Sequence, residues 1–278
     1  MLIRCWGARG SVPVSGRDYQ KYGGDTPCLE IRTNKDSILI IDAGTGIRRL
    51  GNFLLSENRH VYTMLFTHVH WDHVLGLPFF RPIFKSSTQL TIFGCPFQST
   101  SFRKVLSPVI KTPYFPVNFA TLKARIDYND FCEGTLRIDD LTITSIPLSH
   151  PNRGIGFRFE ENGKSFVFLT DNELGYQHPG GLKYNDYVEF ARGADLLVHD
   201  AEYLPQEYAN DNQRWGHSSY TDALRLAMDA GVVRFGLYHH NQDRKDSDLD
   251  VMVEDCRKKA GGRNPDCFAM GQDTEILL

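Results

Sequence analysis

The stretch Thr67–His73 constrains this chain more than any other feature. Directly after the apolar run Val61–Phe66 it contains four side chains that commonly bind metals: His68, His70, Asp72 and His73. Side chains two positions apart point to the same side of an extended strand, so His68 and His70 are expected to share one face. Three imidazoles and a carboxylate suit zinc, iron or manganese, and they would be costly to bury unliganded. The stretch therefore predicts a metal site where a buried strand ends.

Composition limits the class of protein and its partners. The 278 residues are ordinary for a globular protein and are expected to form one domain, residues 1–278. Lys+Arg 31 against Asp+Glu 34 leaves a net charge of −3, which is a poor profile for gripping a long polyanion. No apolar stretch approaches membrane-spanning length, and Met1–Gly7 is typical of a first strand rather than a signal peptide. We expect a cytoplasmic protein with a small substrate and no membrane partner; a homodimer is compatible with the sequence.

The six cysteines are scattered without a Cys-x-x-Cys pair. In a domain of this size, that spacing favours reduced thiols in the core over a disulfide framework.

Metal-capable side chains recur just past the ends of predicted strands. The strands predicted at residues 141–147, 164–169, 195–198 and 234–238 are followed by a matching series: His150, Asp171, His199 with Asp200, and His239 with His240. Ligands gathered from several strand ends onto one rigid face are what a polynuclear site requires.

Four segments permit two interpretations each. The Gly-rich residues 7–13 and 22–27 are either plain turns or part of the metal-binding face. The turn at 42–46 lacks a full phosphate-binding pattern and favours a tight strand-to-helix connection. Phe97–Phe119, rich in aromatics and prolines, is either a packed surface excursion or a pocket wall or lid.

The order of these residues along the chain resembles the metallo-β-lactamase fold superfamily. The similarity covers His68-x-His70-x-Asp72-His73, the later residues His150, Asp171 and His239, and the strand-end Asp42-Ala43-Gly44. It implies an α/β fold of αββα type, in which two mixed sheets pack face to face with helices on both outer faces. It also implies two divalent metal ions, with zinc as the first expectation and manganese or iron also suited.

The same resemblance implies a role for each ligand. His68, His70 and His150 are expected to hold the first metal, and Asp72, His73 and His239 the second, with Asp171 bridging both. His239 is preferred to His240 because it comes first after the strand.

The C-terminal third resembles a phosphodiesterase branch, related to tRNA 3′-processing endonucleases and cyclic-phosphate phosphodiesterases. Leu197–Tyr203 is similar to the branch's His-Glu-Ala strand end, and Trp215–Ser219 to its His-Ser-Thr motif. The resemblance implies that His217 protonates the leaving oxygen and that Asp200 orients it. Asp200 replaces a Glu and Ser219 a Thr, and the shorter Asp200 leaves its reach to His217 open. His199 is expected to support the site without binding metal.

These residues predict hydrolysis of a small nucleotide or cyclic phosphate by a hydroxide that bridges the two metals. Asp72 is expected to accept the proton of the hydroxide, and His217 to act as general acid. His150 and Asp171 are 21 positions apart, which leaves room for a hairpin but not for a long tRNA-gripping arm. The alternatives are a hydrolase of lactone, β-lactam or thioester bonds, a tRNA 3′-processing endonuclease, and a non-enzymatic binder. A hydrolase of lactone, β-lactam or thioester bonds needs no counterpart of His217.

Overall fold

The computed structural model describes residues 1–97 and 99–278, and it contains two seven-stranded sheets. The first sheet has the order β14-β1-β2-β3-β4-β5-β6 and the second the order β13-β12-β11-β10-β9-β8-β7. The strands of the first sheet are β1 (Leu2–Gly7), β2 (Cys28–Arg32), β3 (Ile38–Ile41), β4 (Val61–Leu65), β5 (Gln89–Gly94), β6 (Arg125–Asp130) and β14 (Glu275–Leu277). Those of the second are β7 (Thr135–Ile138), β8 (Leu141–Leu148), β9 (Gly154–Glu161), β10 (Lys164–Leu169), β11 (Leu196–Asp200), β12 (Arg234–Tyr238) and β13 (Asp266–Ala269).

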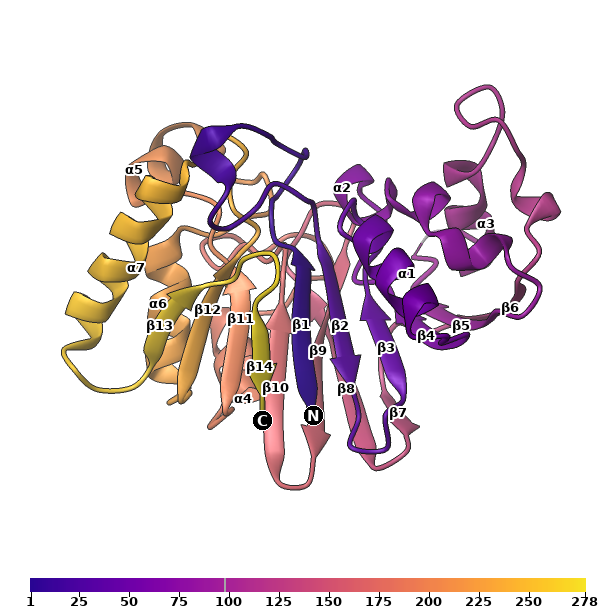
Figure 1. Cartoon of the computed structure of the whole chain (residues 1–278). Helices are drawn as coiled ribbons and strands as arrows, with labels where there is room; N and C mark the ends of the chain where they lie inside the picture. The colour runs from indigo at the N-terminus through magenta and orange to yellow at the C-terminus, as the bar shows by residue number, and fades with distance from the viewer. Residues whose placement is uncertain (98) are drawn as a thin grey trace.

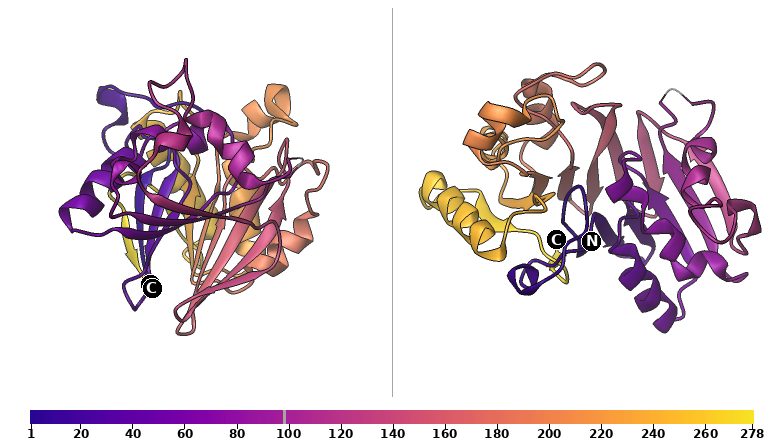
Figure 2. Two further views of the ribbon diagram at one scale, coloured as in Figure 1. Left: turned by 90° about the vertical axis from the view of Figure 1, so that its right-hand side faces the viewer. Right: turned by 90° about the horizontal axis from the view of Figure 1, so that it is seen from above.

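Helices cover the outer faces of both sheets (Figures 1 and 2). The α-helices are α1 (Ile47–Ser56), α2 (Trp71–Val74), α3 (Phe102–Leu106), α4 (Tyr184–Ala191), α5 (Pro205–Glu207), α6 (Tyr220–Asp229) and α7 (Asp246–Ala260), of which the short α2 and α5 lie at the upper rim in Figure 1. No helix in the described part of the chain is long and apolar enough to cross a membrane.

Three apolar layers hold the sandwich together. The central layer lies between the sheets and includes Ile31 from β2 and Phe157 from β9. One outer layer packs the first sheet against α1 and α3, and the other packs the second sheet against α4, α6 and α7. Burying apolar surface in this way is the main favourable contribution to folding. The αββα architecture expected from the sequence is confirmed.

Both sheets are mixed, and this arrangement positions the site. Strands β3 to β6 run parallel to one another, as do β10 to β13, while β1 to β3 and β7 to β10 pair antiparallel. The carboxyl ends of the parallel strands β4, β10, β11 and β12 each lead into a segment of the candidate site. Ligands are commonly held at the carboxyl ends of strands in sheets of this kind.

Two strands were not predicted. Most residues along β6 alternate between exposed and half-buried, and none is buried. The sequence Arg125–Asp130 therefore carries only a weak apolar signal. The short β14 pairs with β1, joining Leu2 to Leu277 across the whole length of the chain. The sequence after the His cluster also predicts a short helix over residues 74–80, limited by Pro78 and Pro82. This prediction is wrong, because α2 covers Trp71–Val74 and a separate 3₁₀ turn covers Leu77–Phe79.

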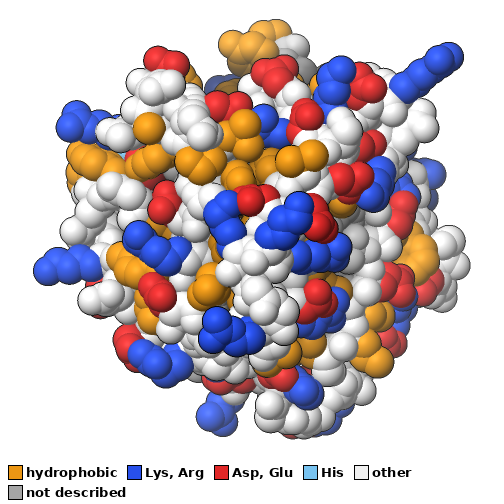
Figure 3. All heavy atoms as spheres, turned by 90° about the vertical axis from the view of Figure 1, so that its left-hand side faces the viewer, with side chains coloured by type: hydrophobic (Ala, Val, Ile, Leu, Met, Phe, Trp, Pro, Cys, Tyr) orange, Lys and Arg blue, Asp and Glu red, His pale blue; other side chains and the backbone are white. Residues whose placement is uncertain are grey.

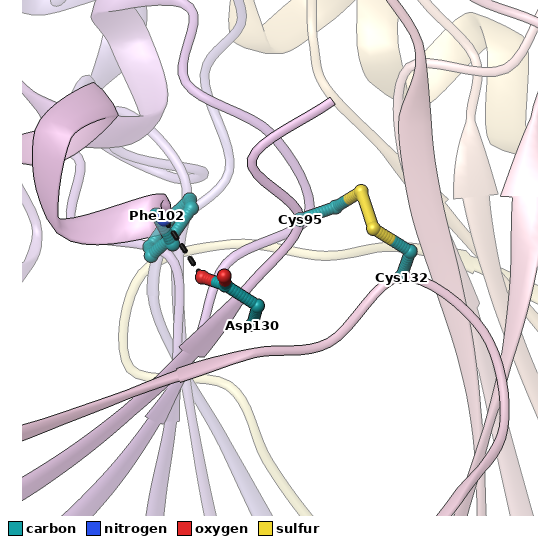
Figure 4. The surroundings of a disulfide bond; sticks show 4 residues. All are labelled: Cys95, Phe102, Asp130 and Cys132. Atoms are coloured by element: carbon teal, nitrogen blue, oxygen red, sulfur yellow. Dashed lines mark hydrogen bonds between the residues drawn. A yellow bond between two sulfur atoms is a disulfide. The ribbon is translucent and has the colours of Figure 1, made fainter. Parts of the chain in front are cut away.

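The expectation that all cysteines are reduced is wrong for two of them. Cys95 and Cys132 form a disulfide with a Cα–Cα distance of 4.5 Å (Figure 4). Cys95 directly follows β5, and Cys132 lies just past β6, so the parallel pairing of these strands brings the two residues together. The other four cysteines are free and buried, as expected.

The excursion Phe97–Phe119 combines both interpretations. Phe102 at the start of α3 is fully buried, and Asp130 of β6 accepts a hydrogen bond from its backbone N–H at 2.8 Å (Figure 4). Tyr114 is 89% exposed, whereas Phe97 lines a cavity beside the metal-capable cluster. The segment is thus a packed excursion whose first residues form a pocket wall.

Candidate metal centre

Seven metal-capable side chains meet at one edge of the sandwich. Four come from the segment between β4 and the end of α2, and the other three follow β8, β10 and β12. The seven are His68, His70, Asp72, His73, His150, Asp171 and His239. All of them are buried except His70, which is half-buried. The structure therefore brings together every residue expected to bind metal.

The first group consists of His68, His70, His150 and Asp171, whose ligand atoms all lie within 4.8 Å of one another. His70 Nδ1 and His150 Nε2 are 2.9 Å apart, and His68 Nε2 is 3.5 Å from Asp171 Oδ2. His68 Nε2 is buried and has no hydrogen-bond partner in the described part of the chain. A buried ring nitrogen without a partner, beside two imidazole nitrogens that face each other, fits a metal ion.

The second group consists of Asp72, His73, Asp171 and His239. His73 Nε2 is 3.2 Å from Asp171 Oδ1 and 3.3 Å from Asp72 Oδ2, while His239 Nε2 is 3.0 Å from Asp72 Oδ2. Because Asp171 belongs to both groups, its two carboxylate oxygens are available to two centres. The donor set fits two divalent cations that share one carboxylate.

Groups behind the cluster fix the orientation of three imidazoles. Asp42 Oδ2 lies 2.8 Å from His73 Nδ1, and Glu202 Oε2 lies 3.0 Å from His239 Nδ1. His150 Nδ1 donates to the backbone carbonyl of Gly216 at 2.9 Å. Such partners set the ring tautomer so that the other nitrogen faces the metal. Glu202 is not among the site residues predicted from the sequence, although it lies only two positions after Asp200.

Three residues of the site have a left-handed backbone. The φ angles of Asp42, Asp171 and His239 are 61°, 51° and 56°. Such a conformation is uncommon outside glycine and is held only where the surrounding structure imposes it. Each follows a strand directly or by one residue, and the change of direction carries its side chain into the cluster.

Electrostatics divide the histidines into two sets. Burial, with the positive charge of His73 beside it, holds the pKa of His68 well below its usual range, and burial also lowers the pKa of His70 and His150. Burial would lower the pKa of His73 and His239 too, but the surrounding carboxylates together outweigh it and raise both pKa values: Asp171, Asp72 and Asp42 around His73, and Asp171, Asp72 and Glu202 around His239. The first set is therefore neutral near pH 7, which is the form that binds metals.

His217 lies at the edge of the second group. Its Nδ1 is 2.6 Å from Asp200 Oδ2, and its ring stacks on that of His239 with centroids 4.7 Å apart. Burial opposes the charged ring, but the carboxylates of Glu202 and Asp200 outweigh it and raise the pKa of His217 to about 9. The shorter Asp200 side chain thus reaches His217 despite the missing methylene.

The neighbouring histidines do not join the cluster. His199 Nε2 accepts from the Asn172 amide at 3.1 Å, and its Nδ1 donates to the Asp200 carbonyl at 2.7 Å. His240 Nε2 donates to the carbonyl of Met270 at 2.6 Å. His239 rather than His240 therefore faces Asp72.

The first Gly-rich segment shapes the face of the cluster. Ser11 donates its backbone N–H to Asp72 Oδ2 at 3.0 Å. A Cβ on Gly10 would lie 2.4 Å from His239 Nδ1, so only glycine lets the loop approach this ring. The turn at 42–46 is a plain strand-to-helix connection, in which Thr26 and Thr45 exchange backbone-to-hydroxyl hydrogen bonds.

The chain resembles several known proteins along nearly its whole length. A ribonuclease Z from Picrophilus torridus is 23% identical over 90% of this chain and 88% of its own length. The metallo-β-lactamase fold protein YhfI from Bacillus subtilis has a TM-score of 0.72 at 17% identity, covering 99% of this chain and 98% of that one. A diphosphatase from the PhnP family has a TM-score of 0.69 at 17% identity, covering 100% of this chain and 97% of that one. The two structures share this fold.

Two mixed sheets between helices, with a histidine and aspartate cluster at one edge, define the class of metal-dependent hydrolases with the αββα fold. The family model described as the beta-lactamase superfamily domain matches residues 38–240. This chain belongs to that superfamily.

Proposed function

We propose that residues 1–278 act as a single dinuclear-metal hydrolase that cleaves small phosphodiesters, such as a nucleotide or cyclic phosphate. The observation that carries the proposal is His217. Asp200 holds its Nδ1, and its ring lies against that of His239. Hydrolysis of a lactone or thioester does not need an acid at this place, whereas an alkoxide leaving a phosphorus atom does.

In this proposal, each group of side chains holds one divalent cation. His68, His70 and His150 hold the first, Asp72, His73 and His239 the second, and Asp171 serves both. Zinc suits the imidazole-rich set, and manganese and iron also suit the carboxylates. When bound, the cations would supply an activated water molecule and would neutralise charge on the phosphoryl oxygens.

The protein's own groups manage the protons. Asp72 Oδ2 faces the interior of the cluster, where it is positioned to accept the proton of the attacking water. Ser11 fixes this oxygen by donating its backbone N–H. His217 carries the proton that the leaving oxygen needs, and Asp200 keeps the ring oriented through its contact with Nδ1. A positioned acid or base of this kind contributes roughly 10²–10⁴-fold to the rate.

The short connection between His150 and Asp171 supports a small substrate. β9 and β10 fill this interval as a hairpin that turns at Asn162 and Gly163. The face bearing α5 and α7 shows acidic and basic side chains interspersed rather than a basic patch (Figure 3). Several of the relatives are named ribonuclease Z, and one of the solved structures is a diphosphatase. The compact hairpin and the mixed surface favour a small substrate over tRNA.

A substrate screen of the purified, metal-replete protein tests the proposal. The panel contains cyclic nucleotides, linear dinucleotides, bis-(p-nitrophenyl) phosphate, lactones and thioesters. We expect the highest kcat/KM on a phosphodiester. A higher value on a lactone or thioester, or cleavage of precursor tRNA in preference to the small diesters, would contradict it.

A further inference from the structure

A polar cavity of about 370 Å³ opens beside the candidate metal centre, on the side of His217. One wall includes Ser11, whose backbone N–H donates to Asp72. Another includes Tyr203, whose ring centroid lies 6.0 Å from that of His217. The cavity thus borders both the second ligand group and the proposed acid.

Trp215 lines this cavity and is 66% exposed. The segment that carries it is fixed, because the backbone N–H groups of Arg214 and Gly216 both donate to the buried Glu173, at 2.7 and 2.8 Å. A large indole held open to solvent on a rigid segment is suited to stacking against a ring of a ligand. Trp71, also beside the metal-capable residues and 69% exposed, is not among the described residues that line the cavity.

The cavity favours an uncharged ligand that donates hydrogen bonds. Its lining has three carboxylates, Glu202, Glu207 and Asp243, and one guanidinium, Arg244, which pairs with Glu207 at 2.5 Å. The buried Oε1 of Gln242 and the buried Nε of Arg244 both lack a hydrogen-bond partner in the described part of the chain. Hydroxyl groups can donate to Gln242 Oε1 and accept from Arg244 Nε, whereas three carboxylates against one guanidinium would repel an additional phosphate.

The opposite side of the metal centre has a different character. There a cavity of about 430 Å³ is lined by apolar side chains such as Val69, Phe97 and Val105, together with Arg153. Arg153 forms no ion pair within residues 1–97 and 99–278. The two cavities therefore suit two different arms of one diester.

We propose, on the basis of the phosphodiesterase function above, that the polar cavity is the subsite for the alcohol that leaves. It selects an alcohol on an uncharged, hydroxyl-bearing ring, such as a nucleoside, stacked on Trp215. In the reaction the oxygen of water forms a bond to phosphorus, and the bond from phosphorus to the alcohol oxygen breaks. That oxygen takes its proton from His217, and the other arm remains on the phosphate monoester.

Two diesters test the subsite: the methyl ester of thymidine 5′-phosphate, and the same compound with a further phosphate at the 3′ position. We expect the protein to release thymidine and methyl phosphate from the first, and to process the second with a kcat/KM at least tenfold lower. Trp215→Ala should lower kcat/KM for thymidine release by roughly tenfold, the scale of a lost stacking contact. Trp71→Ala, the matched control, should lower this kcat/KM less than threefold. Asp243→Asn should reduce the difference in kcat/KM between the two diesters.

Bis-(p-nitrophenyl) phosphate separates this proposal from the function on which it rests. If that compound is hydrolysed but the methyl ester yields thymidine 5′-phosphate and methanol, the subsite is overturned and the function stands. Equal losses in Trp215→Ala and Trp71→Ala, or no penalty for the added phosphate, also overturn the subsite. If no diester is hydrolysed, both proposals fail. Thermal unfolding of each variant shows whether a loss of activity reflects loss of fold.

Discussion

Replacing His217 by alanine removes the proposed acid while leaving all seven candidate metal ligands in place. The ring is positioned before the reaction, because Asp200 holds Nδ1 at 2.6 Å and His239 stacks on it at 4.7 Å. A general acid contributes roughly 10²–10⁴-fold, and this degree of preorganisation places the expected loss at about 10³-fold for an alkyl leaving group. A p-nitrophenolate leaving group needs little protonation, so its hydrolysis should fall by less than about tenfold.

The assay compares kcat on a 2′,3′-cyclic nucleotide with kcat on bis-(p-nitrophenyl) phosphate, at equal metal content. Asp200→Asn is the companion variant, which keeps the imidazole but removes the charge that orients it. Its kcat on the cyclic nucleotide should lie between that of the wild-type protein and that of His217→Ala. Equal losses on both substrates would refute the acid role of His217. So would an alanine variant that retains full activity on the cyclic nucleotide.

Three further changes test the surroundings of the centre. Glu202→Gln should weaken binding of one metal equivalent by roughly 10–100-fold in a chelator competition, because Glu202 orients His239; unchanged affinity would argue against this role. Gly10→Ala should also deplete metal, since the new Cβ would lie 2.4 Å from the His239 ring, whereas Gly154→Ala, with its nearest atom at 3.4 Å, should not. Reduction of the Cys95–Cys132 disulfide, which spans 37 residues, should lower the free energy of unfolding by up to about 4 kcal/mol, measured in urea, without loss of metal; an identical unfolding midpoint with and without reductant would contradict that expectation.

The sequence located the cluster because its ligands are concentrated at strand ends. A run of apolar residues is a local signal, so β4 and the hairpin of β9 and β10 were readily predicted. The order of His68 through His239 then carried the resemblance to the superfamily, and the structure brings these residues into two groups that share Asp171.

Features that depend on contacts between distant segments were not predictable in the same way. The Cys95–Cys132 disulfide requires the pairing of β5 with β6, and β6 has little apolar pattern of its own. Glu202 was missed because its role depends on the position of His239, 37 residues later. The contribution of Gly10 likewise appears only when its loop is packed against that ring.

The most direct test of the dinuclear centre is a count of bound metal. Purified protein is loaded with zinc or manganese, freed of excess ion and analysed by mass spectrometry of the metals. The account predicts two equivalents for the wild-type protein and fewer than one for Asp171→Ala, because that carboxylate serves both groups. Two full equivalents retained by Asp171→Ala would contradict the shared carboxylate on which the account depends.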